Sequence, residues 1–108
     1  CWGYAGEGRT TPPGDMGAVA KLAVGFESNC AISQGTQTLS CWGFGHASPP
    51  GDLGEVLDVS VGRYEICVVK VDHTVLCWDG NSAEYNADVA DVTTATAVSV
   101  QEGGVCVL

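Results

Sequence analysis

The sequence repeats itself at an offset of 37 residues. Residues 12–19 (PPGDMGAV) align without a gap on residues 49–56 (PPGDLGEV), and the alignment continues until Cys30 falls on Cys67. A weaker third copy lies 39 residues further along, where residues 98–100 (VSV) precede Cys106. Self-similarity with a period of this length is typical of propellers, solenoids and other arrays of one small structural unit.

A second repeated element is the pair Cys-Trp, followed by Gly or Asp. It opens each unit, at Cys1, Cys41 and Cys77. The 108 residues leave room for one small domain. We therefore expect a single β-repeat unit over residues 1–108, with repeats at approximately 1–40, 41–76 and 77–108.

Each unit consists of short β segments separated by turn residues. Residues 66–71 and 74–78 are rich in β-branched side chains, and residues 56–61 alternate loosely. Helical periodicity is absent, and the 15 glycines interrupt the chain too often for helices of ordinary length. Residues 89–100 are ambiguous, but their Val and Thr content favours a strand. The expected fold class is all-β, with about three repeats.

Six cysteines are dense for so short a chain, and two pairs are close in sequence. Pairing Cys30 with Cys41 leaves residues 35–36 (GT) as a two-residue loop, which suits a type II′ turn. Pairing Cys67 with Cys77 leaves residues 71–73 as a three-residue loop. Directly opposed residues of a hairpin bring Cα atoms within disulfide range. Both pairs are predicted to form cross-strand disulfides, each contributing ~2–3 kcal/mol.

Charge and cysteine usage narrow the compartment and the partners. Paired cysteines in a small acidic chain indicate a secreted or extracellular protein. The periplasm and the cell surface are the other compartments that fit. The net charge of −9 disfavours nucleic acid and anionic membrane surfaces as partners. No apolar run approaches the ~18 residues that a membrane span requires.

The repeated residues resemble the regulator-of-chromosome-condensation repeat, in its short Cys-Trp-Gly form from secreted or bacterial proteins. The resemblance lies in the order of Gly25 and Gly62, Cys30 and Cys67, and Cys-Trp-Gly. It implies propeller-type antiparallel blades, usually about seven in a ring, each a four-stranded sheet. It also implies structural roles for the two glycines.

Two departures qualify this resemblance. The family's Asn-x-x-Gly-Gln-Leu-Gly stretch after Cys-Trp-Gly is missing, and 108 residues hold fewer than three blades. The chain also starts at the second cysteine of one hairpin and stops after the first cysteine of another, at Cys1 and Cys106. Two interpretations follow: a fragment or trimmed product of a longer propeller, or a head-to-tail assembly in which Cys106 pairs with Cys1 of the next chain. The expected architecture is therefore either a partial propeller or an open or assembled array of β-repeats.

The acidic residues and histidines that could form a catalytic or metal site are better explained as structural residues of loops and turns. Asp15 and Asp52 occupy equivalent loop positions and are expected to form turns. Residues 79–81 (DGN) resemble the start of a calcium loop, but the later ligands are missing. His46 and His73 have neither the Cys-x₂-Cys partners of a zinc site nor a nucleophile motif. We expect no catalytic, cofactor or metal site, and a solvated turn position for His73.

Tryptophan recurs with the repeat, at Trp2, Trp42 and Trp78. Such residues could stack on sugars, but equivalent positions in each repeat favour packing between neighbouring units. The sequence thus predicts a non-catalytic extracellular structural or interaction protein, assembling with copies of itself into a ring or filament. The alternative is a fragment of a larger propeller, completed by its missing blades, that binds a protein or carbohydrate as an inhibitor or lectin would.

Overall fold

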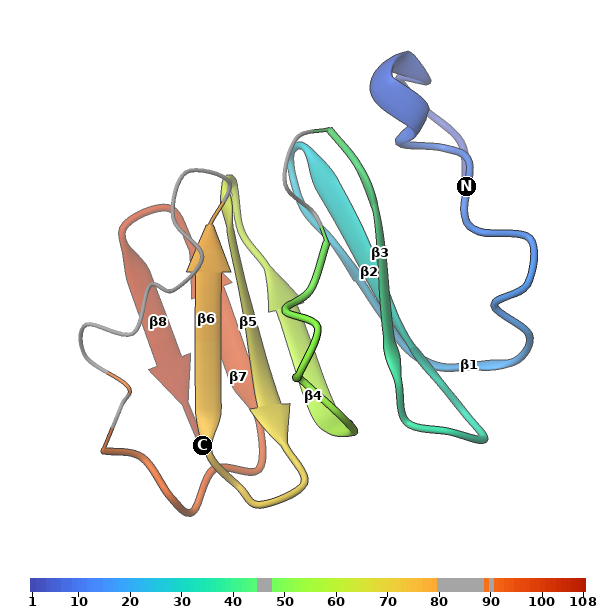
Figure 1. The fold of residues 1–108 in the computed structure, drawn as a ribbon. Coiled ribbons are helices and arrows are strands. Elements are labelled where there is room, and N and C mark those ends of the chain that lie inside the picture. Colours follow the sequence, from blue (N-terminus) through green and yellow to red (C-terminus); the bar gives the residue numbers. More distant parts are fainter. Residues whose placement is uncertain (45–47, 80–88, 90) are drawn as a thin grey trace.

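The computed structural model of the chain describes residues 1–44, 48–79, 89 and 91–108. Apart from a 3-10 turn, η1 (Gly6–Gly8), the regular structure described is β (Figure 1). The three antiparallel sheets contain β1 (Val19–Val24), β2 (Ser28–Ser33) and β3 (Leu39–Gly43); β4 (Val56–Val61), β5 (Glu65–Lys70) and β6 (Val75–Asp79); and β7 (Val98–Gln101) and β8 (Gly104–Val107). The predicted all-β repeat fold is confirmed. No helix among the described residues is long and apolar enough to cross a membrane.

The three sheets are copies of one unit. In the first two, the strands are hydrogen-bonded in sequence order, and the middle strand pairs its cysteine with the cysteine of the third strand. In the third sheet, Ser99 lies opposite Cys106, just as Ser60 lies opposite Cys67 in the second. The Cys-Trp pair lies in the third strand of a sheet. A repeat unit that starts at Cys-Trp therefore contains the last strand of one sheet followed by the first two strands of the next sheet.

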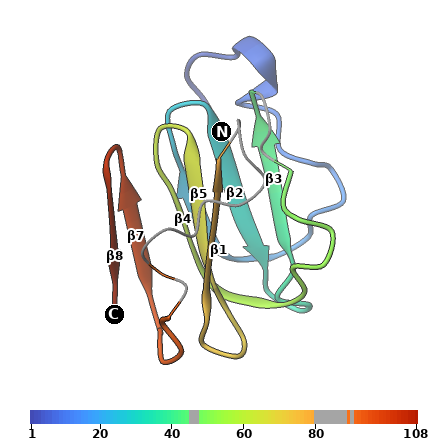
Figure 2. The ribbon, with the colours of Figure 1, turned by 60° about the vertical axis from the view of Figure 1, so that its left-hand side comes forward.

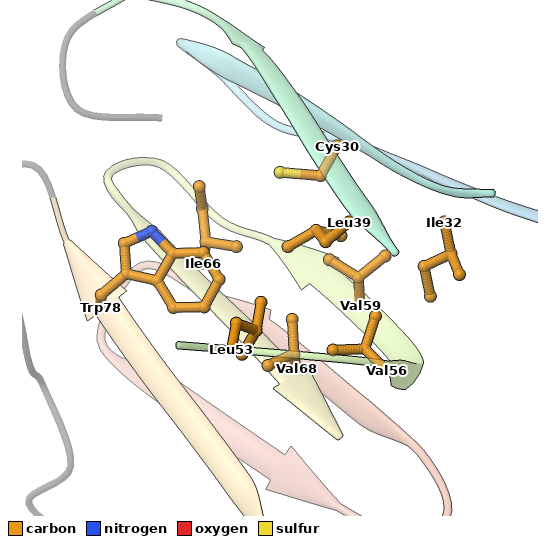
Figure 3. Packing of buried hydrophobic residues seen from close by; sticks show 9 residues of the cluster. All are labelled: Cys30, Ile32, Leu39, Leu53, Val56, Val59, Ile66, Val68 and Trp78. Atoms are coloured by element: carbon orange, nitrogen blue, oxygen red, sulfur yellow. The ribbon is translucent and has the colours of Figure 1, made fainter. Parts of the chain in front are cut away.

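The sheets stack face to face, and the middle sheet is covered on both sides (Figure 2). Along β5, Ile66 and Val68 point into the cluster shared with the first sheet, which Figure 3 shows. The alternating residues Cys67 and Val69 pack into the cluster shared with the third sheet. A strand buried on both faces reads as a continuous apolar run, which explains why residues 66–69 do not alternate.

The first hairpin differs from its predicted turn. Its loop has four residues, 34–37, closed by hydrogen bonds from Ser33 N to Thr38 O and from Gln37 N to Ser33 O, both 3.0 Å. The positive φ lies at Gln37, at 55°, and Gly35 has none. The predicted type II′ turn is therefore wrong. The backbone N–H of Gln34 donates instead to the Ala18 carbonyl at 2.9 Å, on the side of β1.

The second hairpin has the predicted three-residue loop. Lys70 N donates to Thr74 O at 2.9 Å, and His73 takes the left-handed conformation with φ 66°. A three-residue loop of this kind ends in a residue with positive φ.

The predicted strand over residues 89–100 is present only at its end. Strand β7 starts at Val98, and the described residues before it form turns, with Val92 N bonded to Val89 O at 3.1 Å. Ala95 N donates to His73 O at 2.9 Å, which holds this segment on the β5–β6 hairpin. Residue 90 lies outside the described residues.

Candidate functional site

Two disulfides cross-link the complete sheets. They join Cys30 to Cys41 and Cys67 to Cys77, each with a Cα–Cα distance of 4.1 Å. Cys30 lies in the cluster between the first and second sheets, and the second pair lies in the cluster between the second and third. Each bridge therefore faces the next sheet along the chain.

The other two cysteines, Cys1 and Cys106, are exposed thiols. Cys106 stands in β8 opposite Ser99, at the position that Cys67 occupies in the second sheet. In the two complete sheets this position is bonded to the cysteine of a third strand. Within the described residues β8 has no strand on its other side.

The three repeated tryptophans have different surroundings. Trp78 is 2% exposed and packs in the cluster between the first two sheets (Figure 3). Trp42 is buried against the N-terminal segment, where its Nε1 donates to the Arg9 carbonyl at 3.0 Å, beside the Asn29 amide at 2.8 Å. Trp2 is 95% exposed, so the predicted packing role is not met there. The reason is that residues 1–3 belong to no sheet in this chain.

Gly25 and Gly62 start the turns that follow β1 and β4. Their backbone N–H groups donate to Ser28 O at 2.9 Å and to Glu65 O at 2.8 Å. A Cβ on Gly25 would overlap the carbonyl oxygen of Gly62, whereas a Cβ on Gly62 would lie 2.8 Å from the end of the Glu65 side chain. The close approach of two backbones therefore requires glycine at position 25.

We expect Gly25→Ala to lower the free energy of unfolding by about 1–3 kcal/mol, because the clash is with backbone that cannot rotate away. Urea denaturation of the purified chain measures the change. The matched control is Gly62→Ala, where only a flexible carboxylate must move, and its loss should be clearly smaller. Equal losses at the two positions would contradict this account of Gly25.

The turns that follow β1, β4 and β7 line a shallow groove of about 630 Å³, which we call the three-turn groove. It is formed by residues 24–26, 61–63 and 100–102. Figure 1 shows these turns side by side at the upper end of the sheets. Residues far apart in sequence thus form one surface.

Arg63 links the three turns. Its guanidinium lies 5.4 Å from the ring centre of Phe26 and 5.1 Å from that of Tyr64. The same group donates to both carboxylate oxygens of Glu102 at 3.2 Å, and this hydrogen bond is the main cause that raises the pKa of Arg63. Sequence reasoning missed this cluster, because no local pattern relates residues 26, 63 and 102.

Asp58 is a second group that the sequence analysis missed. It is a buried carboxylate that forms an ion pair with Lys21. It also accepts hydrogen bonds from Val59 N at 2.9 Å and Val98 N at 2.8 Å, so it ties the second sheet to its neighbours on both sides. The sequence feature that could have identified Asp58 is the presence of an acidic residue within the largely apolar segment 56–61.

The acids and histidines singled out from sequence form no catalytic constellation among the described residues. Asp15 and Asp52 lie exposed in turns. His73 is exposed, but its Nδ1 lies 2.8 Å from the Ala95 carbonyl, so it is a bridging rather than a merely solvated residue. His46 and residues 80–81 of the calcium-like segment lie outside the described residues. No group of three potential metal ligands occurs in the described part.

Asp72, in the same hairpin loop as His73, has a structural role. The hydroxyl and the backbone N–H of Thr74 both donate to its carboxylate. These hydrogen bonds lower the pKa of Asp72, because they stabilise the charged form. The carboxylate therefore closes the turn.

Three sheets of one repeat, stacked face to face through apolar clusters, define successive blades of a β-propeller. Solved structures agree. The chain is similar to the WD40 ectodomain of the receptor kinase ACR4 from Arabidopsis thaliana, with a TM-score of 0.63 and 24% identity over 83% of this chain and 31% of that one. It is also similar to the ectodomain of the receptor kinase CR4 from Physcomitrella patens, with a TM-score of 0.76 and 24% identity over 100% of this chain and 29% of that one.

The likeness establishes the propeller fold. This chain spans less than a third of the length of either structure. No family model matches the sequence, and no curated protein is significantly similar to it. The resemblance to the regulator-of-chromosome-condensation repeat therefore stays a prediction.

Proposed function

We propose that this chain is a non-catalytic extracellular propeller segment that acts as a structural and interaction unit by joining head to tail with further blades. Its two hairpin disulfides support an oxidising compartment. The similar structures are ectodomains, which supports the same location. The resemblance of its repeats to the Cys-Trp-Gly form of the regulator-of-chromosome-condensation repeat fits this proposal.

The observation that carries the proposal is the position of Cys106. It has the register of Cys67, whose sulfur is bonded to a third strand, yet it is an exposed thiol at a strand edge that no other described strand covers. An unpaired strand edge is a template for another strand. A Cys-Trp-Gly strand is what the two complete sheets place there, and Cys1-Trp2-Gly3 of a second copy has that sequence. The same contact would cover Trp2.

The opposite face of the molecule supports the same arrangement. Leu22 on β1 is 53% exposed, whereas its repeat equivalents Val59 and Val98 are buried between sheets. Val24 is exposed too, although its equivalent Val61 packs against the cluster between the first two sheets. A further blade on this face would bury both side chains and extend the stack.

A hydrogen bond between the second and third sheets indicates which atoms would meet in the head-to-tail contact between two copies. Ser60 Oγ accepts a hydrogen bond from Val100 N at 3.0 Å, across the second and third sheets. Ser99 is the repeat equivalent of Ser60 and lies exposed. In the proposed contact it accepts from Val24 N of the next copy. Repetition of this heterologous contact gives a ring if the rotation closes and a filament if it does not.

The second candidate is a segment of a longer propeller whose other blades cover both faces, with a protein or carbohydrate bound at its loops. The observation that favours it is that this chain spans only 31% and 29% of the two similar structures. The two candidates differ in what pairs with Cys106. A second copy supplies Cys1, whereas a longer chain supplies a cysteine from another sequence.

The test is disulfide mapping of unreduced protein by mass spectrometry, together with light scattering after size exclusion. We expect a peptide that joins Cys106 to Cys1, and a mass that is a multiple of 11.1 kDa. Cys106→Ser should abolish that peptide and leave the Cys30–Cys41 bridge intact. A monomer with both thiols reduced would overturn the proposal. A Cys106 peptide joined to a foreign sequence would establish the second candidate instead.

A further inference from the structure

Two hydroxyl residues occupy the same place in successive repeats. Thr11 and Ser48 each precede the sequence Pro-Pro-Gly-Asp, at the repeat offset of 37 residues. They lie in the irregular segments that lead into β1 and β4, which Figure 1 shows as the blue and green traces before those strands. Residues 11–15 and 48–52 share one pattern, three residues without regular structure and then a turn. The fold therefore presents the same hydroxyl position twice.

Both hydroxyl side chains are accessible. Thr11 and Ser48 are exposed, and neither hydroxyl forms a hydrogen bond within the described part of the chain. By contrast, the exposed hydroxyl of Thr36, in the first hairpin loop, shares a hydrogen bond of 2.8 Å with that of Thr38. The two hydroxyls before Pro-Pro thus have no structural task in the fold.

Ser48 shows that this position stays outside the contacts between sheets. It lies in the segment that joins the first sheet to the second, so a sheet is present on each side of it. Further along the same segment, Leu53 is 5% exposed in the cluster between the two sheets, and its N–H donates to Pro50 O at 3.1 Å. Ser48 is exposed although these neighbours are in place. By the repeat, Thr11 stays accessible when a further blade covers the open face of the first sheet.

Proline restricts the backbone around each hydroxyl. A residue before proline is confined to extended conformations, and proline itself favours polyproline II. Enzymes that modify Ser or Thr side chains bind the acceptor as an extended segment. An acceptor that is already extended loses less conformational entropy when it binds. Hydroxyl residues beside proline are also the composition of O-glycosylated segments.

We propose that Thr11 and Ser48 are acceptor sites for O-glycosylation by a transferase that uses a nucleoside-diphosphate sugar. The hydroxyl oxygen forms a bond to the anomeric carbon of the sugar, the bond between that carbon and the diphosphate breaks, and the hydroxyl proton is released. Nothing is oxidised or reduced. Proline-directed kinases accept the same Ser/Thr-Pro pattern, but the two hairpin disulfides favour the secretory route, where sugars are attached. The inference therefore rests on the extracellular location proposed above.

Incubation of the folded chain with a polypeptide N-acetylgalactosaminyltransferase and its nucleotide sugar tests the proposal. We expect the intact mass to rise by one and then two N-acetylhexosamine units, and electron-transfer fragmentation to locate them on Thr11 and Ser48. Thr11→Ala and Ser48→Ala should each lose one unit, and the double variant should gain none. The matched control is Thr36→Ala, which removes an exposed hydroxyl that no proline follows, and it should still gain both units.

Two further variants keep the hydroxyls and remove the restriction on the backbone. Pro12→Ala and Pro49→Ala should each slow transfer to the preceding hydroxyl and leave the other site unchanged. A proline-directed kinase with ATP is run in parallel on the same chain. No sugar transfer, units on Thr36 instead, transfer only after the hairpin disulfides are reduced, or transfer of phosphate alone would overturn the proposal.

Failure of the acceptor sites is distinguishable from failure of the proposed function. The transfer assay does not depend on the pairing of Cys106, and it reports only on the hydroxyls. Reduced hairpin cysteines in the disulfide map would overturn the extracellular location, whereas an unchanged mass after incubation would overturn the acceptor sites.

Discussion

We expect replacement of Trp78 by alanine to lower the free energy of unfolding by about 3 kcal/mol, near the lower end of the range for buried aromatic truncations. Trp78 is 2% exposed and packs with Leu53 and Ile66 in the cluster that joins the first two sheets (Figure 3). The expected loss of stability is near the lower end of that range because Nε1 of Trp78 is buried without a hydrogen-bond partner among the described residues. The substitution removes that unsatisfied donor together with the apolar ring.

Chemical denaturation followed by circular dichroism measures this change. Trp2→Ala is the matched control, since Trp2 has the same place in the repeat but is 95% exposed. Both variants belong in a Cys1→Ser, Cys106→Ser background, which removes both exposed thiols and so prevents a disulfide between copies. In that background Trp2→Ala should change stability by less than about 0.5 kcal/mol. A loss at Trp2 equal to that at Trp78 would show that position in the repeat, not burial, decides the cost.

Removal of the Cys67–Cys77 disulfide by a double alanine substitution should cost about 3 kcal/mol. Both cysteines are fully buried, and they lie in the cluster between the second and third sheets. The cross-link closes a loop with a sequence separation of 10, so it restricts the unfolded chain. The substitution also removes two buried sulfur atoms from the packing, which adds to the loss.

Thermal unfolding measures the loss as a fall in melting temperature. The control is the double substitution of Cys1 and Cys106 by alanine, because both are exposed thiols. It should leave the melting temperature of the monomer unchanged. Dithiothreitol should lower the melting temperature of that control and have no effect on a chain that lacks both hairpin disulfides. A Cys67–Cys77 double variant that melts with the parent would contradict the stabilising role.

The repeat made much of the fold predictable. The offset between Cys30 and Cys67 identified the unit, and the spacing of each cysteine pair gave the register of both hairpins. The first loop was predicted wrongly because Gln34 bonds to Ala18, a contact that the hairpin sequence does not contain. Trp2 shows the limit of repeat reasoning, since equal position in a repeat gives equal burial only where a neighbouring sheet is present.

The candidate site was less predictable than the fold. Neither the charge balance nor any motif related Phe26 to Arg63 or Glu102, because they meet only when three turns line up across three sheets. Assembly through Cys106 stays a prediction.

The repeat, the antiparallel hairpins and the cysteine pairs follow from the order of the residues alone, because strand register follows from spacings of about ten residues along one chain segment. The folded arrangement was needed to show which face of each strand meets which sheet, how Lys21 and Val98 pair with the buried carboxylate of Asp58, and that three turns form one groove. Stacking depends on non-directional burial of whole faces, so an apolar run shows that a strand is buried but not which sheet covers which of its faces.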